Sequence, residues 1–143
     1  MPADFDTPLY SLQNVRLTFG VHPVFTGLDL FIKKGDKTCL IGRNGSGKST
    51  LLKVIAGIIE PDGGEKFVQP GTKIAYMAQE SDFSEYKTLR DVVMAGLRDP
   101  ADAYKADRLI DKLDLAAEQD PKSASGGERK KAALAQALAG EPD

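Results

Sequence analysis

The sequence predicts an α/β fold in which an apolar run leads into a glycine-rich loop and then into a helix. Three observations support this prediction. Apolar and polar residues alternate in the first part of the 143-residue chain, a glycine-rich loop follows, and helix-forming residues dominate after residue 79. Strands therefore come first, the loop and its helix next, and a small helical region last.

Short alternating or apolar runs predict the strands. They contain β-branched and aromatic residues, and clusters rich in Gly, Pro and Asp separate them. Cys39 lies inside one of these runs, so we expect a buried thiol, whereas His22 beside Pro23 is expected in a solvated loop. The predicted strands are residues 9–19, 28–32, 36–41, 66–69 and 73–78.

Boundary residues and apolar spacing predict the helices. Thr88 is a good N-cap, Ser125 opens the last helix, and Pro142 stops it. The predicted helices are residues 48–56, 89–97, 101–113 and 129–139.

The loop from Gly42 to Ser49 fits the phosphate-binding pattern G-x-x-x-x-G-K-S/T. Glycines let backbone N–H groups surround a triphosphate, and the helix that follows adds unpaired N–H groups and a favourable dipole. Lys48 would reach the β- and γ-phosphates, and the Ser49 hydroxyl would ligate Mg²⁺. The phosphate-binding candidates are Gly42, Asn44, Gly45, Ser46, Gly47, Lys48, Ser49 and Thr50.

Composition and missing motifs exclude several classes of function. The net charge of −2 argues against a general nucleic-acid-binding surface. One cysteine, no run long enough to span a membrane and no signal peptide favour a cytoplasmic protein. Lys48-Ser49 disfavours a dinucleotide site, and the lack of an N-K-x-D-like run disfavours a GTP-specific enzyme.

The segment Ser125-Gly126-Gly127-Glu128-Arg129 resembles the signature motif of ATP-binding cassette (ABC) ATPases. It follows the glycine-rich loop and opens a helix, as in that family, although Ala124 stands where Leu is usual. Gln79 resembles the family's Q-loop glutamine, and Phe19 resembles its A-loop aromatic residue. The resemblance implies a P-loop NTPase core with an antiparallel β subdomain and a small helical subdomain.

The resemblance also implies a role for each motif. Phe19 would stack on the adenine of ATP, and Gln79 would sense the γ-phosphate and Mg²⁺ or the attacking water. Gln79 and Lys48 are the candidate catalytic residues, and Ser49 and Gln79 are the candidate metal ligands. Two cassettes sandwich two ATP molecules in this family, so the signature would contact the nucleotide of a second cassette. The signature residues are Ser125, Gly126, Gly127 and Glu128.

The implied organisation is a β and P-loop part over residues 1–78, a Q-loop and helical subdomain over 79–126, and a signature helix over 127–143. No Walker B aspartate and no Asp-Glu pair is found, and phosphoryl transfer in this family needs these carboxylates. We therefore expect a cassette cut at Asp143, before the Walker B strand, with ATPase activity only in the full-length protein. We also expect an unpaired strand edge at 38–41.

The chain most resembles the ABC-F branch, whose paired cassettes lack a membrane domain and act on ribosomes. Transporter cassettes more often carry Gln where this chain has Glu128, and the segment 80–124 is compact, as in ABC-F proteins. The basic run 129–131 would contact rRNA or form the solvated face of a helix. Two alternatives stay open: the nucleotide-binding subunit of a transmembrane transporter, and a nucleotide-binding fragment that does not hydrolyse.

Overall fold

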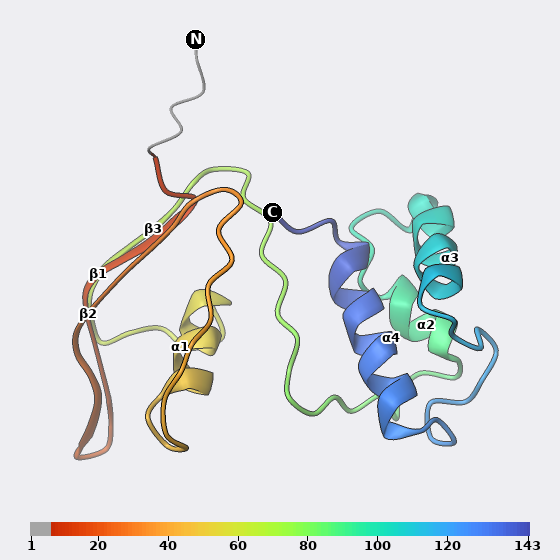
Figure 1. The fold of residues 1–143 in the computed structure, drawn as a ribbon, viewed down its shortest axis with the longest axis horizontal. Coiled ribbons are helices and arrows are strands. Elements are labelled where there is room, and N and C mark those ends of the chain that lie inside the picture. The colour runs from red at the N-terminus through yellow and green to blue at the C-terminus, as the bar shows by residue number, and fades with distance from the viewer. Residues whose placement is uncertain (1–6) are drawn as a thin grey trace, which may run out of the picture. The chain divides into compact units, whose positions relative to one another are not determined.

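The computed structural model describes residues 7–143, which divide into two compact units (Figure 1). The first unit contains the residues up to Thr72 together with Asp143, and the second contains Lys73–Pro142. Each unit has its own cluster of buried apolar side chains. The two units are therefore described one at a time.

The first unit is built on an antiparallel sheet. Its strands are β1 (Tyr10–Phe19), β2 (His22–Ile32) and β3 (Gly63–Val68), in the spatial order β2-β1-β3. The central strand β1 pairs with both neighbours, and irregularities interrupt its register with each of them. The alternation of apolar and polar residues along the strands thus gives the sheet one apolar face and one exposed face.

Helix α1 (Lys48–Ile55) packs against the apolar face of this sheet. Leu51 and Val54 of α1 are buried with Leu12 of β1. The Tyr10 hydroxyl donates a hydrogen bond of 3.4 Å to the Val54 carbonyl, and burial raises the pKa of Tyr10 to about 12. These contacts hold the C-terminal half of α1 on the sheet.

The second unit is helical, and Figure 1 shows its helices side by side. A segment that includes a short 3-10 helix joins the first two α-helices of this unit. These two helices and the third, C-terminal α-helix supply buried apolar residues to one core. The elements are α2 (Leu89–Met94), η1 (Pro100–Asp102), α3 (Ala103–Lys112) and α4 (Gly126–Ala139).

Most of the predicted elements are confirmed, with shifted boundaries. Strand β2 begins at His22, which pairs with Phe19, so the loop expected at His22 is wrong. Helix α4 begins three residues before the predicted start, because the residues of the capping motif already have helical geometry. The ends of a helix depend on the hydrogen bonds of its terminal turns, which residue composition does not specify.

The strands expected at 36–41 and 73–78 are wrong, because neither run forms a strand. A strand is stabilised by hydrogen bonds to a neighbouring strand, and over residues 7–143 the sheet consists of β1, β2 and β3 alone. Cys39 is consequently exposed rather than buried. Apolar and β-branched composition is not enough to make a strand without a partner for its backbone.

Candidate functional site

The glycine-rich loop turns directly into α1 in the first unit. Gly45 has a φ of 82° and Gly47, the N-cap of α1, has a φ of 98°. Glycine adopts these left-handed angles without the steric cost that a Cβ atom brings. Inside the loop, the N–H of Ser46 donates to the Arg43 carbonyl over 3.1 Å. The loop is thus a tight turn that ends at the first residue of the helix.

Two of the glycines also lie close to neighbouring side chains. A Cβ atom on Gly42 would lie 2.8 Å from Ser46 Oγ, and one on Gly47 would lie 3.0 Å from Val24 Cγ1 in β2. A Cβ atom on Gly45 would meet nothing within 4 Å. Gly42 and Gly47 therefore keep the loop closely packed, whereas Gly45 is needed for its backbone angle alone.

The N-terminus of α1 is open to an anion. No side chain caps it, and its first turn contains no acidic residue. The first N–H groups of a helix have no partner within the helix, and the helix dipole places partial positive charge there. The loop residues 42–46 and Ser49 are exposed. An anion of the size of a phosphate can therefore reach these N–H groups from solvent.

The Lys48 side chain folds back over the loop. Its ammonium group donates to the carbonyl oxygens of Gly42 and Arg43, the second at 2.8 Å. Carbonyl oxygens are neutral acceptors, and phosphate oxygens form stronger, charge-assisted hydrogen bonds. A bound phosphate would therefore compete successfully for this ammonium group, which already lies at the loop.

Ser49 offers a hydroxyl ligand for a metal ion at the loop. Among residues 7–143 no group of three or more His, Cys, Asp or Glu residues is placed to hold a metal ion. Magnesium commonly keeps several waters and takes one or two protein ligands beside the phosphates. The exposed Ser49, in the first turn of α1, offers one such hydroxyl ligand.

Phe19 lies at the end of β1 and is 49% exposed. Its strand partner is His22 at the start of β2, and Val24 and Phe25 of the same hairpin lie against Gly47. The hairpin that carries Phe19 therefore contacts the glycine-rich loop. An exposed aromatic ring on this hairpin is available to a planar ligand.

In the second unit, Gln79 lies beside the start of α4. Gln79 is exposed and lines a groove of about 240 Å³ together with Gly126, Arg129 and Lys130. The structure therefore brings Gln79 and one residue of the expected signature motif, Gly126, to one groove, although they are far apart in the sequence.

The residues Ser125 and Glu128 form a capping box at the start of α4. Ser125 Oγ accepts the N–H of Glu128 over 3.2 Å, and the Glu128 carboxylate accepts the N–H of Ser125 over 2.7 Å. These hydrogen bonds lower the pKa of Glu128, because they favour its charged form. Both side chains therefore have a structural role within their own chain.

Gly126 and Gly127 present an open surface at the same helix start. A Cβ atom on Gly126 would meet nothing within 4 Å, and one on Gly127 would be 4.0 Å from Ser125 Oγ. Glycine is a poor helix former, so these residues cost α4 stability without relieving any crowding in the described part of the chain.

Three features of the site were not predicted from the sequence. The hydrogen bonds of Lys48 to loop carbonyls and the packing of Val24 on Gly47 have no local signal, because they join residues through the fold. The capping box of α4 does have a local sequence signal, the pattern Ser-x-x-Glu. A second capping box, formed by Thr88 and Asp91, precedes α2.

The family model described as "ABC transporter" matches residues 25–143. The chain belongs to the ABC transporter family. The resemblance to ATP-binding cassettes that rests on the glycine-rich loop and the signature motif is thereby confirmed. The α/β fold class is confirmed by the likeness to solved cassette structures given below.

Two curated relatives illustrate this kinship. The chain is 44% identical over 137 residues to the ATP-binding protein Uup of Caulobacter vibrioides, covering 95% of this chain and 22% of Uup. It is 33% identical over 139 residues to the aliphatic sulfonates import ATP-binding protein SsuB 1 of Agrobacterium fabrum, covering 93% of this chain and 50% of that protein. The chain thus spans half or less of the length of these two relatives.

Solved structures show the same fold. The dimeric ATP-binding cassette MJ0796, in a post-hydrolysis state with ADP and Pi, matches with a TM-score of 0.81 at 24% identity. The match covers 93% of this chain and 70% of MJ0796. Within residues 7–143, no helix combines the length and the apolar character needed to cross a membrane.

Proposed function

We propose that the cassette binds Mg-ATP with its triphosphate on the loop from Gly42 to Thr50. The observation that carries this proposal is the open start of α1, with no cap, no acidic residue and the Lys48 ammonium group at the loop. Lys48 would exchange its two carbonyl partners for phosphate oxygens. Ser49 would ligate the phosphate-bound Mg²⁺, which when present neutralises charge on the β- and γ-phosphates.

Phe19 of the first unit and Gln79 of the second unit would each have a separate role toward the nucleotide. The exposed ring of Phe19 would stack on adenine, since its hairpin packs on the glycine-rich loop. Gln79 would sense the γ-phosphate and Mg²⁺ or the attacking water, and its exposed position leaves its amide group accessible.

The signature motif would serve the nucleotide of a second cassette. The N–H groups at the start of α4 and the bare surface of Gly126 and Gly127 suit close approach of a phosphate from outside. Ser125 would contribute its hydroxyl group while Glu128 holds the helix start. The partner is a second cassette, on the same chain or another, and hydrolysis requires this pair in the full-length protein.

The branch of the family that we favour is ABC-F, in which ATP hydrolysis drives a conformational change on ribosomes. Its support is the 44% identity to Uup, against 33% to SsuB 1, together with Glu128 in the signature. All three residues of the basic run, Arg129, Lys130 and Lys131, are exposed, but the Arg129 guanidinium group already has a partner within the chain. It donates to the carbonyl of Pro121 over 3.0 Å. Contact with rRNA would therefore fall to the two lysines.

Two other functions compete with this one. The likeness to SsuB 1, an import ATP-binding protein, favours a nucleotide-binding subunit that docks on a transmembrane subunit. The third possibility is a module that binds nucleotide and does not hydrolyse it.

The experiment is to assay phosphate release by the full-length protein with and without purified 70S ribosomes, with Lys48→Ala as control. The ABC-F proposal predicts Lys48-dependent hydrolysis that ribosomes stimulate and co-sedimentation of the ATP-bound protein with them. Hydrolysis that ribosomes leave unchanged, in a protein that pellets with membranes instead, would favour the transporter function. Phosphate release no greater than that of Lys48→Ala would leave nucleotide binding as the function.

A further inference from the structure

Gln119, in the segment between α3 and α4, contacts the starts of two helices in the second unit. Its backbone carbonyl accepts the N–H of Leu89, the first residue of α2, over 2.9 Å. Its side-chain amide donates to the carboxylate of Glu128, in the first turn of α4, over 3.3 Å. Gln119 belongs to none of the motifs predicted from the sequence. It nevertheless joins the helix that follows the segment of Gln79 to the helix that carries the signature motif.

The start of α2 holds the backbone around Gln119 in place. Besides Leu89, Arg90 also donates its N–H to this segment, to the Ala117 carbonyl over 2.9 Å. The first N–H groups of a helix have no partner within the helix, and here the carbonyls of the segment supply one for each of these two residues. The side chain of Gln119 therefore reaches α4 from a backbone that two hydrogen bonds attach to α2.

Two donors meet at the same carboxylate oxygen of Glu128. Glu128 Oε2 accepts the N–H of Ser125 over 2.7 Å and the side-chain N–H of Gln119 over 3.3 Å. The last torsion of a glutamate side chain is broad, and either oxygen can accept, so the second donor favours one oxygen and one orientation. The carboxylate is thus held from two sides at the start of α4.

The orientation of Glu128 bears directly on Ser125. Ser125 Oγ accepts the N–H of Glu128 over 3.2 Å, and a hydroxyl group that accepts in this way still has its own proton to donate. In the described part of the chain no group accepts that proton. Because Ser125 is exposed, the proton is available to an oxygen atom that approaches from outside.

We propose that Gln119 is a positioning residue for the signature motif, which acts through Glu128 to aim the Ser125 hydroxyl group at the nucleotide of a second cassette. The inference rests on the proposed function of the signature and adds a residue to it. Gln119 is half-buried and its amide is directed at Glu128, so it would not contact the nucleotide itself.

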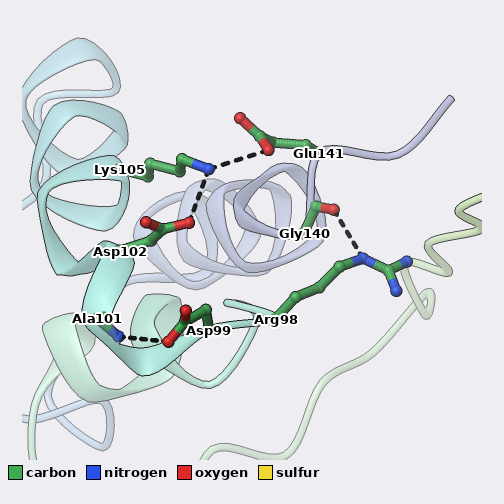
Figure 2. Close-up of polar contacts among 7 residues, drawn as sticks. All are labelled: Arg98, Asp99, Ala101, Asp102, Lys105, Gly140 and Glu141. Atoms are coloured by element: carbon green, nitrogen blue, oxygen red, sulfur yellow. Dashed lines mark hydrogen bonds and ion pairs between the residues drawn. The ribbon is translucent and has the colours of Figure 1, made fainter.

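The opposite end of α4 provides a control, because other contacts hold it (Figure 2). Lys105 Nζ lies 2.8 Å from a carboxylate oxygen of Asp102 and 3.1 Å from one of Glu141, which follows the helix. The 14 residues of α4 extend over roughly 20 Å. Loss of these ion pairs would loosen the end of α4 and leave the contacts of Ser125 in place.

The main test is Gln119→Met in the full-length protein, a change that keeps the length of the side chain and removes its donor. The kcat for phosphate release should fall about tenfold, the size expected when a hydrogen bond to a charged group is lost. The Kd for Mg-ATP, measured by isothermal titration, should stay within about twofold, because the phosphate loop is unchanged. A loss confined to kcat assigns the effect to the signature rather than to nucleotide binding.

Lys105→Met is the matched control, since it removes the ion pairs at the other end of the same helix. Its kcat and Kd should both stay within about twofold of the unchanged protein. Hydrogen–deuterium exchange over α4 measures how far each variant loosens the helix, so that a general loss of stability can be told apart from a misplaced Ser125.

An exchange of the two interacting groups tests the pairing itself. Gln119→Glu alone places two carboxylates against each other and should lower kcat about tenfold or more. Gln119→Glu combined with Glu128→Gln again pairs one amide with one carboxylate and leaves an amide oxygen for the N–H of Ser125. The combined variant should recover kcat to within about threefold of the unchanged protein.

Three results would overturn the inference alone: an unchanged kcat in Gln119→Met, equal losses in Gln119→Met and Lys105→Met, or no recovery in the exchanged pair. Phosphate release by the unchanged protein no greater than that of Lys48→Ala would overturn the proposed function, and the inference with it.

Discussion

Helices α1 and α4 both have glycine at their start, as the N-cap Gly47 of α1 and as the first residue Gly126 of α4, yet their N-termini differ in capping. The start of α1 has no side-chain cap and no acidic residue, and a lysine lies on the carbonyls of its loop. The start of α4 is closed by the capping box of Ser125 and Glu128. The comparison teaches that capping groups decide which N–H groups at a glycine-containing helix start stay open to a ligand.

The largest effect should come from removing the cation at the open helix start. Lys48→Ala deletes an ammonium group that lies at the loop. A charge-assisted hydrogen bond contributes about 1.5–3 kcal/mol, so Mg-ATP should bind roughly 10- to 150-fold more weakly. Isothermal titration of the full-length protein measures this change.

Lys53→Ala is the matched control for Lys48→Ala. Lys53 is an exposed lysine of the same helix, in its last turn, where the dipole offers nothing to an anion. Mg-ATP should bind this variant within about twofold of the unchanged protein. Equal losses in the two variants would mean that Lys48 acts through general charge rather than through its place at the loop.

The next largest effect is a difference in local stability between alanine variants of Gly45 and Gly47, the two loop glycines that have positive φ. Gly47→Ala adds both left-handed strain and close contacts with Val24 and Phe25, whereas Gly45→Ala adds strain in open space. We expect losses of about 2–3 kcal/mol for Gly47→Ala and about 1 kcal/mol for Gly45→Ala. Hydrogen–deuterium exchange over α1 reports both as local opening free energies.

A larger cost for Gly45→Ala than for Gly47→Ala would contradict the packing of β2 on the loop. The pair also predicts different nucleotide affinities, because displacement of the hairpin moves Phe19 with it.

A smaller effect is expected at the closed helix start. Ser125→Ala removes the cap of α4 and should lower the local stability of that helix by about 1 kcal/mol, whereas Ser125→Asp keeps a capping side chain. Hydrogen–deuterium exchange over peptides of α4 measures the local stability of the helix in both variants. If the signature also serves a second nucleotide, Ser125→Asp should keep the helix stable and lose hydrolysis, because its carboxylate repels phosphate. Full activity in Ser125→Asp would argue against that role.

The smallest effect is a pH dependence of the same cap. The pKa of Glu128 is lowered by its hydrogen bonds with Ser125, so the contribution of Glu128 is present above the unfolded pKa near 4.3 and disappears as pH falls through the lower folded pKa. Exchange over α4 should therefore increase below about pH 4 in the unchanged protein. In Glu128→Gln this acid-dependent step should be absent, and its persistence would assign the step to another group.

The sequence predicted those parts of the molecule that depend on local signals. The glycine-rich loop, the helix that follows it and the N-caps Thr88 and Ser125 could be read because each uses neighbouring residues. The strands of the antiparallel sheet were recognised from alternation. The family followed from the order of two motifs.

The features that the sequence did not predict depend on distant partners. The runs 36–41 and 73–78 have the composition of strands and do not form them, since no neighbouring strand pairs with their backbone in the described residues. His22 was expected in a loop because Pro23 follows it, but pairing with Phe19 places it in β2. The contact of Val24 with Gly47 likewise depends on how the hairpin packs.

The most direct measurement is a crystal structure of the full-length protein with Mg²⁺ and a non-hydrolysable ATP analogue. The account predicts phosphate oxygens within hydrogen-bonding distance of the N–H groups at residues 45–50. It also predicts that Lys48 Nζ has moved from the Gly42 and Arg43 carbonyls to the phosphates. At α4, the capping box should persist, with any phosphate contact coming from the nucleotide of a second cassette. Lys48 still on its carbonyls with the triphosphate bound elsewhere would contradict the account.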